Sequence, residues 1–253
     1  MIGVFDSGLG GLSVLAAIAR ALPRADLLYF ADTAHLPYGN KSDAFIRGRV
    51  LAIGDRLAEL GCRLLVVACN TATAAAITEL RQRHPELTVV GVEPGIKPAA
   101  TSSRSGRIAV LATESTARSE RLKRLIRDHA GHVRVHVEAC PGWATRVEAL
   151  DLDGAEFAAE IAARVAPLLA DGTDRLVLGC THYSFLAPQL QPLLPPGAEL
   201  VDVAAAVARQ VVRLAGNHTA GSARLELHAS ARLERLHAAL PRLSLGWLVQ
   251  RIK

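Results

Sequence analysis

The chain has 253 residues, of which 50% are hydrophobic and 4% aromatic, and it carries a formal net charge of +5 at pH 7. Such a length can form one large domain or two smaller ones. No apolar segment approaches the roughly 20 residues of a membrane-spanning helix, so we expect a cytoplasmic protein without membrane contact. The basic residues are scattered and are not interleaved with aromatic residues, which disfavours nucleic-acid binding without excluding it.

The four cysteines are few for this length and widely spaced: Cys62, Cys69, Cys140 and Cys180. None belongs to the C-x-x-C pair that is typical of zinc knuckles and thioredoxin-like dithiols. We therefore expect free thiols, with neither a disulfide framework nor a metal site. Cys62 and Cys140 are assigned to packing, because free cysteine is often buried.

Short apolar runs alternate along the chain with longer amphipathic segments, which predicts an α/β fold with a mainly parallel sheet. The expected strands are residues 2–5, 27–31, 64–68, 89–92, 108–111, 133–137, 176–178 and 200–201. The expected helices are residues 12–22, 42–60, 73–84, 119–129 and 157–169. The polar segment 97–106 is expected to cross between two domains, and residues 217–253 carry no motif that assigns them a place.

Two stretches of the first half of the chain recur in the second half. The sequence IGVFDS at residues 2–7 has the pattern of IAVLAT at residues 108–113, and RLLVVACNT at residues 63–71 matches RLVLGCTH at residues 175–182. These matches favour an internal duplication, although matches this short also arise by chance between unrelated α/β units.

Cys69 and Cys180 each follow a buried strand, at the position where open α/β sheets form ligand sites. If the two halves face each other, the two thiols flank one cleft. A proton acceptor on one face of a carbon centre and a proton donor on the other face together invert that centre, so the pair favours racemisation. The unperturbed thiol pKa of about 8.5 lies near working pH, and a helix beginning after each strand would lower it. Taken singly, each cysteine could instead be a core residue.

Polar side chains surround the two cysteines in the sequence. Asn70, Thr71 and Thr181 are expected at helix starts, where they and backbone N–H groups can hold a substrate carboxylate. His182 is placed to tune the pKa of the second thiol. Asp6 follows the first strand and is either a functional carboxylate or a helix cap.

Five motifs together resemble those of the glutamate racemase family. They are FDSGLGGLSV at residues 5–14, DTAHLPYGNKS at 32–42, ACNTA at 68–72, GVEPGIKPA at 91–99 and LGCTHY at 178–183. They occur in the family's order and extend over residues 2 to 186. Each motif alone is weak, whereas the set is highly specific.

The resemblance implies two similar three-layer α/β domains, residues 1–96 with 204–253 and residues 97–203. The domains would be related by a pseudo-twofold axis, with the active site in the cleft between them. It also implies a cytoplasmic homodimer that uses no pyridoxal phosphate, metal or nucleotide. The product, D-glutamate, would serve peptidoglycan synthesis and so the cell wall and cell shape.

The resemblance further assigns catalytic roles to four residues. Cys69 would take the proton from D-glutamate and Cys180 from L-glutamate, Asp6 would assist Cys69 or the substrate ammonium, and His182 would assist Cys180. The implied substrate contacts are Ser7, Pro37, Tyr38, Gly39, Asn70, Thr71, Thr113, Thr116 and Thr181. Secondary carboxylates near the site would be Asp32 and Glu148, although the segment 140–147 before Glu148 is less apolar than in the family pattern.

Other functions stay open at this point. Gly8, Gly10 and Gly11 after a strand resemble part of a dinucleotide-binding fingerprint, but Ser13 stands where the third glycine belongs. The same two cysteines could serve a related substrate, such as aspartate, a hydantoin or maleate. The chain could also be a racemase-like protein that binds DNA gyrase or nucleic acid.

Overall fold

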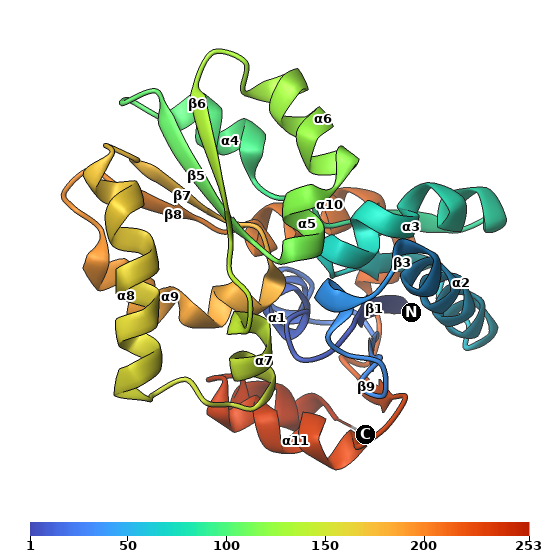
Figure 1. Cartoon of the computed structure of the whole chain (residues 1–253). Helices are drawn as coiled ribbons and strands as arrows, with labels where there is room; N and C mark the ends of the chain where they lie inside the picture. Colours follow the sequence, from blue (N-terminus) through green and yellow to red (C-terminus); the bar gives the residue numbers. More distant parts are fainter. Residues whose placement is uncertain (253) are drawn as a thin grey trace.

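The computed structural model describes residues 1–252, with the side chains of residues 217 and 218 excluded. It contains two wholly parallel sheets (Figure 1). The first has the order β4-β3-β1-β2-β9, with β1 Ile2–Asp6, β2 Leu27–Ala31, β3 Leu64–Val67, β4 Thr88–Gly91 and β9 Leu225–Ala229. The second has the order β6-β5-β7-β8, with β5 Arg107–Ala112, β6 Arg134–Ala139, β7 Arg175–Leu178 and β8 Glu199–Val201.

Helices cover both faces of each sheet, because successive strand residues point to opposite faces. In the first sheet, Ile2 and Val4 pack with α1, α10 and α11, whereas Phe5 packs with α2 and α3. The bounds of these helices are α1 Leu12–Ala21, α2 Asp43–Glu59, α3 Asn70–Arg83, α10 Ala204–Leu214 and α11 Leu233–Arg242.

The second sheet is built in the same way. Leu111 packs with α7 and α8, and Val110 packs with α4 and α6 on the other face. The remaining helices have the bounds α4 Ile96–Ser102, α5 Glu114–Arg118, α6 Glu120–His129, α7 Trp143–Glu148, α8 Ala155–Ala170 and α9 Ala187–Leu190. The predicted α/β class is therefore confirmed, with two three-layer units.

Most predicted elements are confirmed within a few residues of their ends. The segment 97–106, which we expect to cross between the domains, begins within α4 Ile96–Ser102. The tail, to which the sequence assigned no element, contains β9, which pairs with β2, and α11. We propose that the domain boundaries lie at residues 97 and 204, because the elements after residue 204 pack on the first sheet. No helix of residues 1–252 combines the length and the apolar character that a membrane span needs.

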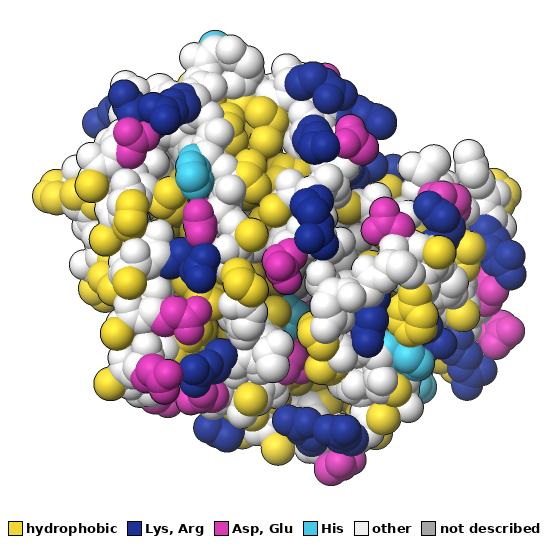
Figure 2. All heavy atoms as spheres, in the orientation of Figure 1, with side chains coloured by type: hydrophobic (Ala, Val, Ile, Leu, Met, Phe, Trp, Pro, Cys, Tyr) yellow, Lys and Arg dark blue, Asp and Glu magenta, His cyan; other side chains and the backbone are white. Residues whose placement is uncertain are grey.

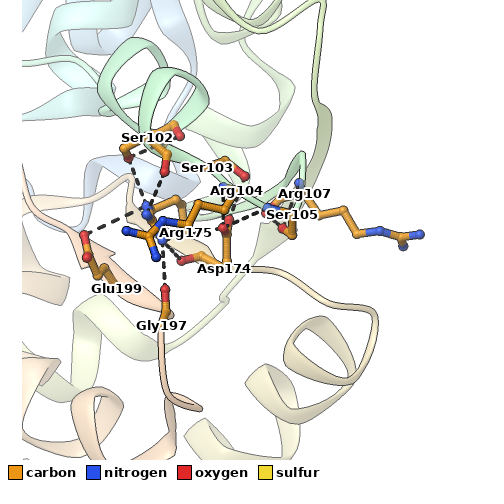
Figure 3. A network of polar contacts seen from close by, with 10 residues as sticks. Ser102, Ser103, Arg104, Ser105, Arg107, Asp174, Arg175, Gly197 and Glu199 are labelled. Atoms are coloured by element: carbon orange, nitrogen blue, oxygen red, sulfur yellow. Dashed lines mark hydrogen bonds and ion pairs between the residues drawn. The ribbon is translucent and has the colours of Figure 1, made fainter.

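A buried arginine joins α4 to the second sheet (Figure 3). Arg175, the first residue of β7, is only 4% exposed. Its guanidinium donates hydrogen bonds to the hydroxyl and the carbonyl oxygen of Ser102, at 2.9 and 2.6 Å, and to the carbonyl oxygens of Asp174 and Gly197, at 2.7 and 3.1 Å. The side chain thus satisfies backbone groups from three segments of the chain.

The neighbouring Asp174 explains why the segment after α4 is polar. Its carboxylate accepts hydrogen bonds from the Ser103 hydroxyl at 2.6 Å and from the backbone N–H groups of Arg104 and Ser105 at 2.6 and 3.0 Å (Figure 3). The polar residues of this segment therefore bind a carboxylate that fixes the turn between α4 and β5.

We expect Arg175→Leu to lower the free energy of unfolding by about 3 kcal/mol, because it removes all the hydrogen bonds that the guanidinium donates to Ser102, Asp174 and Gly197. Urea denaturation followed by circular dichroism measures this change. Arg63→Leu is the matched control, since Arg63 occupies the corresponding place before β3 but is exposed, and it should change stability by less than about 0.5 kcal/mol. Equal effects of the two substitutions would contradict the role given to Arg175.

Candidate active site

The loops after β1, β2, β3, β5, β6 and β7 surround one cavity of about 130 Å³. This is the carboxyl edge of both sheets, where parallel α/β structures bind ligands. From the first sheet the lining residues are Ser7, Pro37, Tyr38, Gly39, Asn40, Cys69, Asn70 and Thr71. From the second they are Thr113, Glu114, Cys140, Pro141, Gly142, Ala144, Thr145, Cys180 and His182.

Most residues singled out in the sequence meet at this cavity. Those that line it are Ser7, Pro37, Tyr38, Gly39, Cys69, Asn70, Thr71, Thr113, Cys180 and His182. Those that lie behind the lining are Asp6, Asp32, Thr116, Glu148 and Thr181, of which all but Glu148 are buried. Both candidate catalytic thiols therefore face one cavity, and each comes from a different sheet.

Cys69 lies between β3 and the first turn of α3. Its sulfur is 3.9 Å from the Ser7 hydroxyl. Burial raises the pKa of the Cys69 thiol well above its usual range, and the Asp6 carboxylate raises it further. The hydrogen bond from the backbone N–H of Ala72, at the start of α3, lowers this pKa but does not outweigh burial. The expected lowering by the helix start is therefore present at Cys69, but burial outweighs it.

Asp6 lies directly behind this side of the cavity and is fully buried. Its Oδ2 accepts a hydrogen bond of 2.7 Å from the backbone N–H of Gly11, and its Oδ1 has no partner among residues 1–252. Burial raises the pKa of Asp6 more than His182 and the Gly11 hydrogen bond lower it. The bond to Gly11 shows that Asp6 holds the turn before α1, and the free oxygen leaves it able to accept another hydrogen bond.

Cys180 follows β7 and precedes a short 3-10 helix, η2 Thr181–Leu186, where an α-helix was expected. Its sulfur is 3.6 Å from His182 Nδ1, and His182 Nε2 is 2.5 Å from Glu148 Oε1. Burial alone would lower the pKa of His182, but its contacts with Cys180 and Glu148 outweigh burial and raise that pKa well above its usual value. These contacts favour the protonated form of His182, whose positive charge would lie beside the second thiol.

Glu148 contacts the site more directly than we expect from the sequence, which gives it only a secondary place near the site. Besides its contact with His182, Glu148 Oε1 accepts a hydrogen bond of 2.6 Å from the backbone N–H of Leu9. A Cβ atom at Gly8 would collide with the Glu148 carboxylate, and one at Gly10 would collide with the His182 ring. The glycine-rich turn is therefore filled by the chain's own side chains, which overturns its interpretation as a dinucleotide-binding loop.

Asp32 acts on the cavity through the turn that forms one wall. Its buried carboxylate accepts hydrogen bonds of 2.9 Å from Arg49 Nε and Nη2 and one of 2.6 Å from the Tyr38 hydroxyl. Burial raises the pKa of Asp32, but the bonds from Arg49 and Tyr38 reverse this and lower it to about 2. This fixed charge positions Tyr38 and, next to it, Gly39.

Neutral polar groups dominate the part of the cavity near α3 and α5. The hydroxyls of Thr71, Thr113 and Thr116 form a triangle with sides of 3.1 to 3.2 Å. Neither polar atom of the Asn70 side chain has a partner among the described residues. No lysine or arginine of residues 1–252 lines the cavity, so a ligand carboxylate there would be held by hydroxyl, amide and backbone donors.

Sequence reasoning missed several lining residues, namely Asn40, Glu114, Cys140, Pro141, Gly142, Ala144 and Thr145. The assignment of Cys140 to packing alone is wrong, because its buried side chain also lines the cavity. Its place directly after β6 was the available signal, since neighbouring parallel strands end at the same edge. Among residues 1–252 there is no group of three or more His, Cys, Asp and Glu side chains that could hold a metal ion.

Comparison with known proteins gives consistent matches over nearly the whole chain. The sequence model of a family described as Asp/Glu/Hydantoin racemase matches residues 2–211. A glutamate racemase from Stutzerimonas stutzeri is 48% identical over 243 residues, which cover 95% of this chain and 92% of that protein.

Solved structures agree with the sequence matches. Escherichia coli glutamate racemase, crystallised with L-glutamate and the activator UDP-MurNAc-Ala, superposes with a TM-score of 0.84 at 35% identity, covering 96% of this chain and 94% of that one. A glutamate racemase isoform from Bacillus anthracis gives a TM-score of 0.86 at 29% identity, with coverages of 100% and 95%.

We expect Glu148→Gln to lower the pKa of His182 by about one unit or more, because an amide cannot replace the charge of the carboxylate that stabilises the protonated ring. Titration of the ring resonances by NMR measures this pKa. Glu156→Gln is the matched control, since the Glu156 side chain is 88% exposed on α8, and it should leave the pKa of His182 unchanged. An unaltered His182 titration in Glu148→Gln would contradict the coupling.

Proposed function

Because the chain belongs to the Asp/Glu/Hydantoin racemase family and is an enzyme of the isomerase class, we propose that it interconverts L-glutamate and D-glutamate by proton transfer between two cysteines. The observation that carries the proposal is that Cys69 and Cys180, from different sheets, line the same small cavity. No cofactor enters the proposed reaction. The proton acceptor on one face of the substrate α-carbon and the donor on the other are both side chains of this chain.

In the direction from D- to L-glutamate, the Cys69 thiolate removes the α-proton and the Cys180 thiol delivers its own proton to the opposite face. The electron pair left on the α-carbon forms the new C–H bond, and the enzyme ends with a Cys69 thiol and a Cys180 thiolate. The reverse reaction starts from that state. Burial raises the pKa of the Cys69 thiol, which makes its thiolate a stronger base toward the weakly acidic α-proton once it forms.

The polar groups around each thiol support this assignment of roles. His182, protonated through its contacts with Cys180 and Glu148, stabilises negative charge on Cys180 after proton donation. Asp6 lies behind Cys69, where its unpaired Oδ1 can serve that thiol or the substrate ammonium. The proposal thus gives different partners to the two thiols.

The cavity also supports an acidic amino acid as the substrate. Ser7, Asn70, Thr71 and the Thr113–Thr116 pair supply neutral donors for two carboxylates, helped by backbone N–H groups at the start of α3. Glutamate is favoured over aspartate, a hydantoin or maleate, because the relatives that match almost the whole chain are glutamate racemases, one of them crystallised with L-glutamate. Tyr38, Gly39 and Thr181 would complete the substrate wall.

We further propose the cellular setting that this activity implies in the family. The enzyme would be a cytoplasmic homodimer that supplies D-glutamate for peptidoglycan and thereby supports the cell wall and cell shape. A binding role toward DNA gyrase or nucleic acid is less well supported than racemisation, because both thiols line one small cavity. Such a role becomes the alternative only if the protein racemises nothing.

The direct test follows α-hydrogen exchange by NMR in D₂O, with L- and D-glutamate offered separately. Wild-type protein should invert both enantiomers and place deuterium at the α-carbon. Cys69→Ala and Cys180→Ala should each lose at least about 10³-fold in racemisation, because each lacks one of the two required groups. Cys62→Ala removes a buried thiol that does not line the cavity, and it should keep its activity if it folds.

Undiminished racemisation by either Cys69→Ala or Cys180→Ala would exclude the two-thiol mechanism. Wild-type protein that leaves glutamate unchanged would exclude the substrate, and aspartate and hydantoins would then be tested in the same assay.

The pH dependence of kcat/KM should be bell-shaped, because activity needs one thiol and one thiolate. It falls at low pH when the last thiolate is protonated and at high pH when both thiols ionise. Burial raises the pKa of Cys69, so the alkaline limb should lie above the value of about 8.5 for an exposed thiol.

The profiles for L- and D-glutamate should also coincide at every pH, since mirror-image substrates have equal free energies in water. Initial rates followed by circular dichroism from about pH 6 to about pH 10 give both profiles. A flat profile, or two profiles that diverge, would contradict the mechanism.

A further inference from the structure

A second hollow, of about 430 Å³, adjoins the candidate active site. We call it the basic groove and define it by its lining residues from the segments 41–43, 71–78 and 115–124. Each of these segments continues directly from the wall of the cavity. Asn40 lines the cavity and Lys41 the groove, Glu114 lines the cavity and Ser115 the groove, and Thr71 lines both. The groove therefore begins where the substrate wall ends.

The basic groove carries positive charge that is not used in ion pairs. Lys41, Arg118 and Arg124 line it and are exposed, and none of the three forms an ion pair with any of residues 1–252. Figure 2 shows lysine and arginine side chains gathered over α5 and α6, on this side of the molecule.

Two other charged residues of the groove form ion pairs with residues outside its lining. Arg121 pairs with Glu93, and Glu120 pairs with Lys123 at 2.6 Å. Asp43, in the first turn of α2, is the remaining acid. Three unpaired cations against one acid leave the groove with a net positive charge, although the adjoining cavity is lined by neither lysine nor arginine.

This separation of charge has a physical consequence for an anionic substrate. Glutamate carries a net charge of −1 near neutral pH, and the neutral donors of the cavity exert little force on it at a distance. Cations beside a cleft raise the local concentration of an anion and its rate of capture. Because they stand outside the cavity, they do so without forming a tight ion pair that would retain the product.

We propose that the basic groove is the path by which the anionic amino acid approaches the cavity, and that Lys41, Arg118 and Arg124 attract it there. This inference rests on the proposed glutamate racemase activity and adds to it three residues that act before the substrate reaches the two thiols. They are capture residues and not catalytic ones, since none of them lines the cavity.

The test measures kcat and KM for D-glutamate at several ionic strengths, for wild-type protein, Lys41→Gln, Arg118→Gln and Arg124→Gln. At about 10 mM salt, where charges act over about 30 Å, each variant should lower kcat/KM about two- to five-fold. The loss should appear in KM, with kcat nearly unchanged. Near 1 M salt, where the screening length is about 3 Å, variants and wild type should converge.

Arg209→Gln provides the matched control. It removes the same charge from an exposed arginine, but Arg209 lies on α10, which packs on α1 and β4 and does not line the groove. Its kcat/KM should equal that of wild type at every salt concentration. An equal loss in Arg209→Gln would reduce the effect to net charge and overturn the proposal.

Normal racemisation with a kcat/KM that is independent of salt would also overturn the proposal, while leaving the proposed function intact. A fall in kcat without a change in KM in the groove variants would likewise overturn the proposed approach path and leave the proposed function intact. No racemisation by wild-type protein would contradict the proposed function, and with it this inference.

Discussion

The rest of the site depends on the contacts of the Glu148 carboxylate, because they connect segments that follow strands of both sheets. The carboxylate accepts a hydrogen bond from the backbone of Leu9, in the turn after β1, and contacts His182, in the segment after β7. Through Leu9 it fixes the turn that Asp6 also holds, and through His182 it sets the surroundings of Cys180. The Glu148 side chain is only 10% exposed, and removing a carboxylate from water is costly unless it has partners. Leu9 and His182 both contact its Oε1.

The two thiols are alike in sequence but not in surroundings. Cys69 is adjacent to a carboxylate and the start of an α-helix, whereas Cys180 is adjacent to the His182 imidazole and the start of a 3-10 helix. In the proposed racemisation, each thiol would act as acid in one direction and as base in the other. The two thiols would thus perform the same chemistry with unlike neighbours.

Much of the fold could be read from the sequence, because buried parallel strands appear as short apolar runs and their order predicts helices between them. The tail could not, because the alternating sequence LELHA of β9 is only five residues long and its partner β2 lies nearly 200 residues earlier. The strand ends that precede Cys69 and Cys180 could likewise be recognised from the sequence. The Glu148–His182 contact was not, because it joins residues that only the packing of α7 against η2 brings together. Nor was the raised pKa of Cys69, which comes from burial.

The position of β9 in the first sheet has a consequence for how the protein is made. Every strand of the second sheet lies between residues 107 and 201, whereas the first sheet is closed by β9 at residues 225–229 and covered on one face by α10 and α11. On the ribosome, the second unit is thus synthesised whole while the first still lacks an edge strand and two helices. The part of the apolar face of β1, β2 and β3 that α10 and α11 cover in the folded protein therefore lacks its cover during that interval.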